Sequence, residues 1–358
     1  MTLAQQLSSH LPGITFQPEV PLAPMTYFKI GGPAEAFAKI NQPDRLPTLS
    51  AYCAQQQIPL TVLGGASNVI VADQGVRGLI IRLTNDEVSL SDSPTGSTLT
   101  APSPKAGQPT GPAPSPATDA EPSPTTRQPS KQLTAGAGAR TALLVKAAID
   151  AGLTGLEQFL GVPGTVGGAI YNNAHYLQNL IGRHIRRVQV VTTDHRLSWL
   201  WHDDCRFGYD SSRFQTSREI IVRAEFELAM GNRQRSEQLI AAATRYRAQT
   251  QPLGEPSSGC IFQNVKLTPQ LAAEFPQFTS QGFVPSGYLI DQAGLKGTTV
   301  GGVTVSPKHA AFFINSGGGT ARDAKQLVAL VKAKVKTKFG VELQEEVFYL
   351  GQDLPEQS

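Results

Sequence analysis

Residues 63–83 read LGGASNVIVADQGVRGLIIRL, a glycine turn between two short apolar runs. Glycine adopts positive φ readily and lets backbone N–H groups approach a ligand without a Cβ in the way. Successive N–H groups in such a turn form a concavity that suits a pyrophosphate, and Ser67 and Asn68 add side-chain donors. Because a strand rather than a helix follows the turn, the stretch does not match the Rossmann fingerprint. It predicts a nucleotide cradle of a different kind.

Two further glycine-rich turns could also present backbone N–H groups to a ligand. They are residues 27–37 (YFKIGGPAEAF) and 161–173 (GVPGTVGGAIYNN), and the short run AGAG at 135–138 supports them. A single such turn usually marks a tight bend and nothing more, and the chain has no GxxxxGK[ST] phosphate-binding loop. Several turns separated by strands nevertheless indicate a dinucleotide cradle built from several loops.

Helix and strand patterns alternate around these turns. Residues 43–57 and 139–152 read as amphipathic helices, with Cys53 on the buried face of the first and Gly152 ending the second. Near the C-terminus, residues 309–340 predict a strand, a glycine turn and a helix that begins with a Thr320–Asp323 capping box and ends at Gly340. The other expected elements are strands at 59–65, 79–83, 186–194 and 218–228 and a long helix at 234–250.

The composition limits the class of protein. A length of 358 residues indicates two or three domains. The net charge is only +3, and no basic stripe with interleaved aromatics is present, so no nucleic-acid partner is expected. Three widely spaced cysteines form neither a disulfide framework nor a CxxC zinc pair, which favours a reducing compartment and no metal site. Because no secretory signal and no run of 18 apolar residues is visible, the chain is expected in the cytoplasm with no membrane partner.

Residues 91–131 differ from the rest of the chain in composition. Pro, Ser, Thr, Ala and Gly dominate, and large apolar residues are almost absent. Such a segment buries too little surface to offset the entropy lost on ordering, so it is predicted to be a disordered surface insertion. A binding site for a proline-docking partner is the alternative.

Eight ordered blocks resemble the UDP-N-acetylenolpyruvoylglucosamine reductase family and cover nearly the whole chain except this insertion. They are TYFKIGG (26–32), LGGASNVIVADQGVRGLIIRL (63–83), AGAGAR (135–140), GLEQFLGVPGTVGGAIYNNA (155–174), SSGCIFQN (257–264), GYLIDQAGLKG (287–297), HAAFFIN (309–315) and FGVELQEEV (339–347). The short stretch between Phe214 and Cys260 is similar to the shorter type of this family.

The resemblance implies a fold and an activity. The fold is of the α+β or α/β class: a two-lobed FAD-binding domain of the vanillyl-alcohol-oxidase type at 1–229, a smaller α/β substrate-binding domain at 230–350, and a tail at 351–358. The implied enzyme is a monomer that uses FAD and NADPH to reduce the enolpyruvyl group of a UDP-sugar in peptidoglycan precursor synthesis. The residues that match the FAD-binding positions are Tyr27, Ile30, Gly31, Gly64, Gly65, Ala66, Ser67, Asn68, Gly136, Gly138, Gly161, Pro163, Gly164, Thr165, Gly167, Gly168 and Ala169. Ala66 stands where the family usually has a third glycine.

The resemblance also implies catalytic and substrate-binding residues. Cys260 occupies the position of the family's proton donor, which is usually a serine and sometimes a cysteine, and the thiol is the stronger acid of the two. A buried core cysteine is the alternative. Glu346 matches the glutamate that hydrogen bonds to the developing enolate, whereas its neighbours Glu342 and Glu345 are expected to face solvent. Tyr209, Asn264 and His309 match positions near the substrate, although a purely structural histidine is equally compatible with the sequence at 309.

One position departs from the family pattern. The catalytic arginine of the family lies in a Tyr-Arg-x-Ser motif, but this chain has Asp210 between Tyr209 and Ser211. A carboxylate would repel a substrate carboxylate, so we hypothesise that Arg213 reaches the same space, against the alternative that it is an ordinary surface residue. His175 is expected to line the flavin without a catalytic role. The rival functions are an FAD-linked alcohol or hydroxy-acid oxidase and a catalytically impaired flavin-binding homologue.

Overall fold

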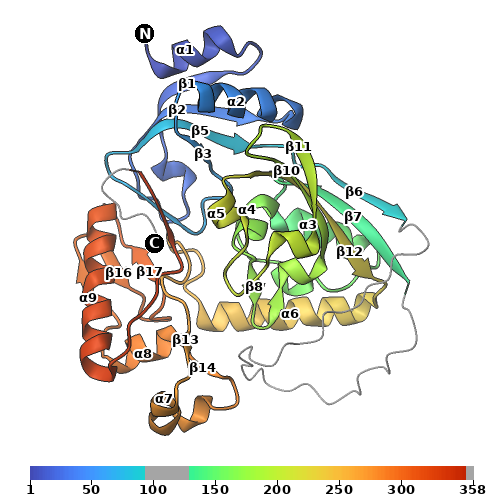
Figure 1. Cartoon of the computed structure of the whole chain (residues 1–358). Helices are drawn as coiled ribbons and strands as arrows, with labels where there is room; N and C mark the ends of the chain where they lie inside the picture. The colour runs from blue at the N-terminus through green and yellow to red at the C-terminus, as the bar shows by residue number, and fades with distance from the viewer. Residues whose placement is uncertain (93–128, 352–358) are drawn as a thin grey trace.

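The computed structural model describes residues 1–92 and 129–351, and Figure 1 gives the arrangement of the elements. Most of the predicted insertion therefore lies outside the described residues, as does the tail from residue 352. The ends of the predicted insertion differ from expectation. Strand β6 (Val88–Asp92) pairs antiparallel with β7 (Ser130–Gly136), so residues 91–92 and 130–131 belong to a sheet ladder.

The first lobe is a four-stranded sheet in the order β1-β2-β5-β3. Its strands are β1 (Phe16–Pro21), β2 (Pro33–Ile40), β5 (Val76–Leu83) and β3 (Leu60–Val62). β5 runs parallel to both β2 and β3, and helix α2 (Leu46–Gln55) provides the crossover connection between β2 and β3. Leu49 and Cys53 of α2 are buried in the core, as the helical spacing predicts, together with Leu7 of helix α1 (Leu3–His10).

The second lobe is a five-stranded antiparallel sheet in the order β11-β10-β12-β7-β6. Its other strands are β10 (Ile185–Val191), β11 (Leu197–Trp201) and β12 (Ile220–Ala229). Helices α3 (Thr141–Asp150) and α4 (Val166–Tyr171) contribute buried side chains to a core that is continuous with that of the first lobe. Two short helices occur in the first lobe, η1 (Ala23–Met25) and η2 (Pro43–Arg45). The short elements of the second lobe are η3 (Glu157–Phe159), β8 (His175–Tyr176), β9 (Asn179–Leu180), η4 (Ile181–His184), η5 (His202–Cys205) and α5 (Phe214–Ser217).

A smaller α/β unit follows, with a core of its own. Its elements are β13 (Val265–Lys266), α7 (Pro269–Glu274), η6 (Pro276–Phe278), β14 (Phe283–Val284), α8 (Ser286–Gln292), β15 (Thr299–Val300), β16 (Val303–Val305), β17 (Phe313–Asn315) and α9 (Ala321–Phe339). Phe28, Ile30 and Ile70 of the first lobe pack into the same core. Strand β18 (Phe348–Leu350) then returns to the first lobe and pairs in parallel with β4 (Val69–Val71).

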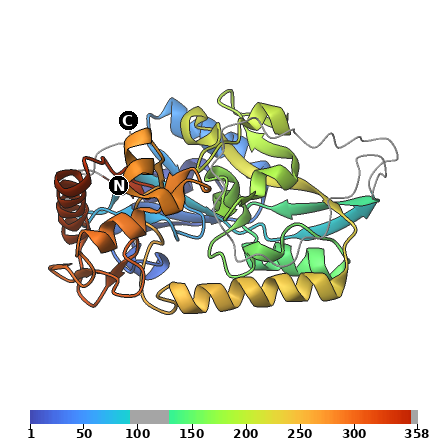
Figure 2. The same ribbon diagram turned by 90° about the horizontal axis from the view of Figure 1, so that it is seen from below.

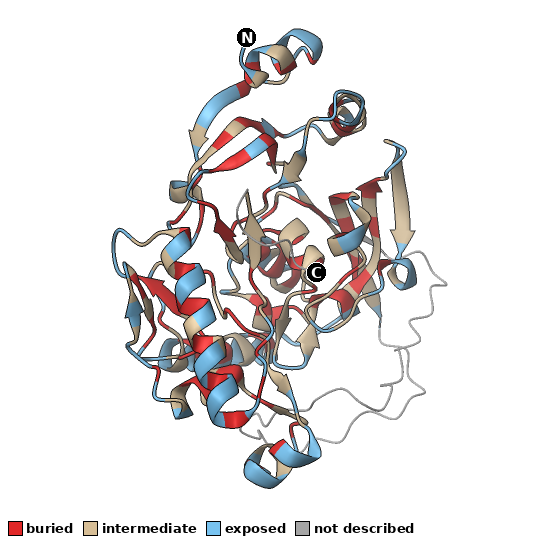
Figure 3. Ribbon diagram, turned by 60° about the vertical axis from the view of Figure 1, so that its left-hand side comes forward, coloured by how far each residue is buried: buried red, intermediate tan, exposed pale blue. Residues whose placement is uncertain are grey.

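Local signals in the sequence define the ends of two helices. Helix α3 ends at Asp150, two residues before Gly152, which adopts a φ of +70°. Helix α9 has the predicted Thr320–Asp323 capping box and ends at Gly340, which is left-handed with a φ of +67°. Its buried residues form one stripe along the helix, as Figure 3 shows. Both helices confirm the prediction from sequence.

Helix α6 (Arg233–Thr250) lies along the second lobe, as Figure 2 shows. The Ser236 hydroxyl donates to the buried carboxylate of Glu157, and the Arg247 guanidinium donates to the carbonyls of Gln158 and Leu160. Helix α6, which the expected boundary at residue 230 assigns to the C-terminal unit, is thus hydrogen-bonded to the first unit, and its Ala248 carbonyl also accepts from Lys308 of the C-terminal unit at 2.6 Å. The two-lobed unit followed by a smaller α/β unit confirms the expected fold class. Within residues 1–92 and 129–351, no helix has the length and apolarity to span a bilayer.

Candidate active site

The predicted FAD-binding loops converge in the structure. The N–H of Tyr27 donates to the carbonyl of Ala66 at 3.0 Å, and the hydroxyl of Ser67 donates to the carbonyl of Pro163 at 3.1 Å. A Cβ on Gly65 would lie 2.3 Å from the Cα of Gly164, so the turns at 64–68 and 161–168 touch backbone to backbone. Three segments that are far apart in sequence thus form one surface.

The AGAG run joins this surface. The N–H of Gly167 donates to the carbonyl of Ala137 at 2.9 Å, which ties the run to the start of α4. Cβ atoms on Gly136 and Gly138 would lie 2.1 Å and 2.6 Å from the backbone oxygens of Asn85 and Leu83. These two glycines are therefore required by close packing of the chain on itself.

Residues 64–67 provide a run of free donors. Within the described part of the chain, their four backbone N–H groups have no hydrogen-bond partner. Ala66 is buried and adopts a left-handed φ of +54°, the conformation for which the family uses glycine. A turn of unpaired N–H groups fits an anion such as the pyrophosphate of FAD, and a Cβ on nearby Gly168 would meet no protein atom closer than 3.6 Å. The residues present therefore fit this cofactor.

Glu346 lies beside this cradle. The Asn68 side chain donates to the backbone carbonyl of Glu346 at 3.2 Å, and the N–H of Glu346 donates to the carbonyl of Ile261 at 2.8 Å. The second bond joins the QEEV segment to the residue that follows Cys260. The structure therefore brings Asn68, Cys260 and Glu346 to one place, although they lie in three separate blocks of the sequence.

The two neighbouring glutamates of QEEV have different surroundings. Glu345 accepts hydrogen bonds from Lys332 of α9 at 2.7 Å and from the hydroxyl of Tyr349 at 2.5 Å, so it anchors the segment and is not simply solvent-facing as expected. Glu342 is exposed and paired with Lys336. The pKa of Glu346 is well above its usual value, first because its carboxyl group is buried and second because Asp210 places a negative charge nearby. Both effects favour the protonated form of the Glu346 carboxyl group.

The thiol of Cys260 is also neutral. Its pKa is raised well above the usual value by burial and then by the negative charges of Glu346 and Asp210. Cys53 and Cys205, by contrast, are core residues, and burial raises their pKa values to about 11 and about 12. Cys260 is the cysteine that retains partial exposure, and it carries an S–H that can donate a proton.

The three predicted substrate-binding residues lie around the same place. Asn264 donates to the Tyr209 hydroxyl at 3.3 Å and accepts from the N–H of Ser286 at 3.2 Å. His309 lies against the first turn of α8, because a Cβ on Gly287 would lie 3.1 Å from its ring. Burial lowers the pKa of His309. The pKa of Tyr209 is raised by burial of its hydroxyl and by the charges of Asp210 and Glu346, which keeps it a hydrogen-bond donor.

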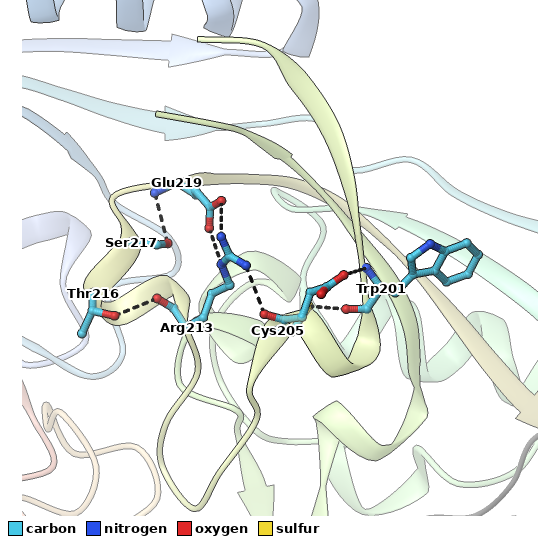
Figure 4. Close-up of polar contacts among 7 residues, drawn as sticks. Trp201, Cys205, Arg213, Thr216, Ser217 and Glu219 are labelled. Carbon is cyan, nitrogen blue, oxygen red and sulfur yellow. Dashed lines mark hydrogen bonds and ion pairs between the residues drawn. The ribbon is translucent and has the colours of Figure 1, made fainter. Parts of the chain in front are cut away.

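Arg213 does not follow the hypothesis made from sequence. Its Nε and Nη2 atoms donate to the two carboxylate oxygens of Glu219 at 2.9 Å and 3.0 Å, and its Nη1 atom donates to the carbonyl of Asp204 (Figure 4). None of its contacts with the described residues is with Cys260, Glu346 or Tyr209. The structure thus places Arg213 in an ion pair with Glu219, away from the residues with which the hypothesis grouped it.

Asp210 lies in the site instead, and sequence reasoning missed what holds it there. One carboxylate oxygen is 3.0 Å from Nδ1 of His175. The Asn173 amide donates to the carbonyl of Gly208, and the Ser212 hydroxyl donates to the carbonyl of Tyr171, so the turn at 208–212 is fixed to the end of α4. Two unrelated loops supply the pair, and no local signal in the sequence links them.

Known proteins of one family resemble this chain in sequence and in fold. The family model "UDP-N-acetylenolpyruvoylglucosamine reductase, C-terminal domain" matches residues 251–350. The reductase of Heliobacterium modesticaldum is 32% identical over 331 residues, covering 92% of this chain and 89% of that protein. The reductase of Lactobacillus johnsonii is 33% identical over 341 residues, covering 95% and 96%. The crystal structure of the Thermus caldophilus enzyme superposes with a TM-score of 0.65 at 26% identity, covering 94% of this chain and 98% of that one. The chain is thus an oxidoreductase, and it belongs to the UDP-N-acetylenolpyruvoylglucosamine reductase family.

Proposed function

We propose that this enzyme binds FAD and uses NADPH to reduce UDP-N-acetylglucosamine enolpyruvate to UDP-N-acetylmuramate in peptidoglycan precursor synthesis. The observation that carries the proposal is the Asn68–Glu346 hydrogen bond, because it joins the loop of free N–H donors to the two neutral acids. FAD bound at these loops would supply the hydride carrier between NADPH and the terminal alkene carbon of the substrate.

The residues of the chain supply the other steps. As hydride reaches the terminal carbon, negative charge develops on the carboxylate-bearing carbon and its carboxyl group. Glu346, which keeps its proton, donates a hydrogen bond to that charge. Cys260 then transfers its thiol proton to the carbon, and the resulting thiolate regains a proton from solvent. Tyr209 and Asn264 orient the substrate as hydrogen-bond donors.

The test is an absorbance experiment on the purified protein. We expect a bound flavin spectrum that NADPH bleaches under anaerobic conditions and that the enolpyruvyl nucleotide restores. A flavin bleached by an alcohol or a hydroxy acid but not by NADPH would identify an oxidase instead. A flavin that NADPH bleaches but the nucleotide fails to restore would identify an impaired homologue. A protein that takes up no flavin would overturn the proposal.

Two further expectations belong to this proposal. All three cysteines are free in the structure, which supports a reducing compartment such as the cytoplasm. The enzyme is expected to act as a monomer, with its site contributed by one chain. Size-exclusion chromatography with light scattering tests this, and a stable dimer would contradict it.

A further inference from the structure

The candidate active site has an unusual charge composition. The pKa values of Cys260, Glu346 and Tyr209 are all raised by burial and by negative neighbours, and no neighbouring cation contributes to any of the three shifts. The proposed substrate carries a carboxylate at its reacting end. A carboxylate that enters a site containing Asp210 and no cation would be repelled. A cation must therefore come from another side chain.

The Asp210 side chain is buried in the site, and its backbone is fixed by a hydrogen bond. It adopts a left-handed φ of +48°, a conformation that costs a non-glycine residue about 1–2 kcal/mol. Its side chain is 7% exposed, and its backbone carbonyl accepts from the Gln215 amide at 2.9 Å. Within the described residues, its second carboxylate oxygen is buried without a partner. An ionised group held in this way requires a compensating charge.

His175 is the side chain that faces Asp210. Its Nδ1 atom lies 3.0 Å from the carboxylate, and its ring lies tilted over Tyr209 with the centroids 4.9 Å apart. The side chain is 21% exposed. Among the described residues, Nε2 of this ring has no hydrogen-bond partner. When the ring is protonated, both nitrogens are donors, so one serves Asp210 and the other is free beside the residue that orients the substrate.

We infer that His175, fixed by Asp210, provides the positive charge and the hydrogen bond that receive the carboxylate of the enolpyruvyl substrate. Arg213 is not placed to do so, because its guanidinium is held by Glu219 and the Asp204 carbonyl and makes no contact with Tyr209, Cys260 or Glu346 among the described residues. The inference rests on the proposed function, since it assumes a carboxylated ligand. It assigns His175 a role in substrate binding, and it makes Asp210 the residue that positions this histidine.

The test compares two nucleotides on the oxidised holoenzyme, without NADPH. UDP-N-acetylglucosamine enolpyruvate carries the carboxylate, and UDP-N-acetylglucosamine lacks it. We expect His175→Gln to weaken binding of the first roughly tenfold to hundredfold, the value of a charge-assisted hydrogen bond, and to leave binding of the second unchanged. The exposed His10, on α1, gives the matched control His10→Gln, which should alter neither.

A double variant tests whether the positive charge of His175, rather than the shape of its side chain, is what the ligand requires. The double variant His175→Gln/Asp210→Arg places a cation at position 210 and should regain affinity for the carboxylated nucleotide. Equal weakening of both nucleotides by His175→Gln, or an unchanged affinity for both, would overturn the inference while wild-type turnover still supports the proposed function. Absence of flavin or of turnover in the wild type would overturn the proposed function itself.

Discussion

Cys260 combines a neutral thiol with partial exposure, and this combination makes a specific prediction at the level of one residue. Burial and the charges of Glu346 and Asp210 raise its pKa, so in the proposed reaction the proton stays on sulfur until the carbanion forms. Cys260→Ala removes that donor and should slow reoxidation of reduced flavin by the enolpyruvyl nucleotide by about 10²–10⁴-fold, the usual contribution of a general acid. Reduction by NADPH should be unaffected.

The control for this prediction is Cys260→Ser, which retains an O–H at the same position and should preserve most of the reoxidation rate. Stopped-flow absorbance measures both half-reactions separately. If the alanine variant is reoxidised as fast as the wild type, the proton comes from another group. If both half-reactions slow together, the substitution has damaged the flavin environment rather than removed an acid.

Ala66 gives a second prediction for a single residue. It has a φ of +54° in the turn at 64–68, and this conformation strains an L-residue by about 1–2 kcal/mol. Ala66→Gly relieves this strain but loses a buried methyl group and gains freedom in the unfolded chain. We expect the free energy of unfolding in urea to stay constant or to rise by up to about 1 kcal/mol. The control Ala72→Gly, at a buried position without positive φ, should lower it; equal losses in the two variants would contradict the strain argument.

The N-terminus of helix α9 is capped by a residue of another part of the chain. The N-terminus of α9 has its own capping box. In addition, the carboxylate of Asp73 accepts hydrogen bonds from the N–H groups of Ala321 and Arg322 at 2.7 Å and 3.0 Å. Asp73 follows strand β4 of the first lobe, so this cap links the two units of the protein.

Asp73→Ala should destabilise the chain by about 0.5–2 kcal/mol, as measured for helix caps. Urea unfolding should show this loss, and the exposed Asp86→Ala should not. An unchanged midpoint in Asp73→Ala would show that the capping box alone is sufficient.

Elements with local signals were predictable from the sequence, and contacts between distant elements were not. Thr320, Asp323 and Gly340 define α9 because each acts on the backbone of its own helix. The Asn68–Glu346 bond joins residues 278 positions apart, and only the resemblance to the family placed them together. The resemblance placed His175 and Asp210 each near the site, but neither it nor any local pattern indicated that the two side chains pair with each other. The ion pair between Arg213 and Glu219 was also not expected from the sequence, because spacing along the chain does not show which way a side chain points.

At the scale of the whole molecule, helix α6 supports the segment that leads into the glycine turn at 161–168. Arg247 is buried, donates to the carbonyls of Gln158 and Leu160 at 2.5 Å and 2.6 Å, and lies over the ring of Tyr176 at 4.5 Å. These carbonyls belong to the segment that leads into Gly161. Burial is the main cause that lowers the pKa of Arg247, and hydrogen bonding to carbonyls is what makes a buried guanidinium tolerable.

Arg247→Met keeps the apolar stem of the side chain but leaves both carbonyls unsatisfied. We expect a loss of about 1–3 kcal/mol in unfolding free energy and faster release of flavin, because the loop that ends at Gly161 loses its support. Arg245 lies two residues away on the exposed face of the same helix, so Arg245→Met is the matched control and should change neither quantity. Chemical denaturation measures the first, and the appearance of free flavin fluorescence after dilution measures the second. A loss of stability without faster flavin release would mean that α6 holds the lobe together but does not shape the cofactor loop.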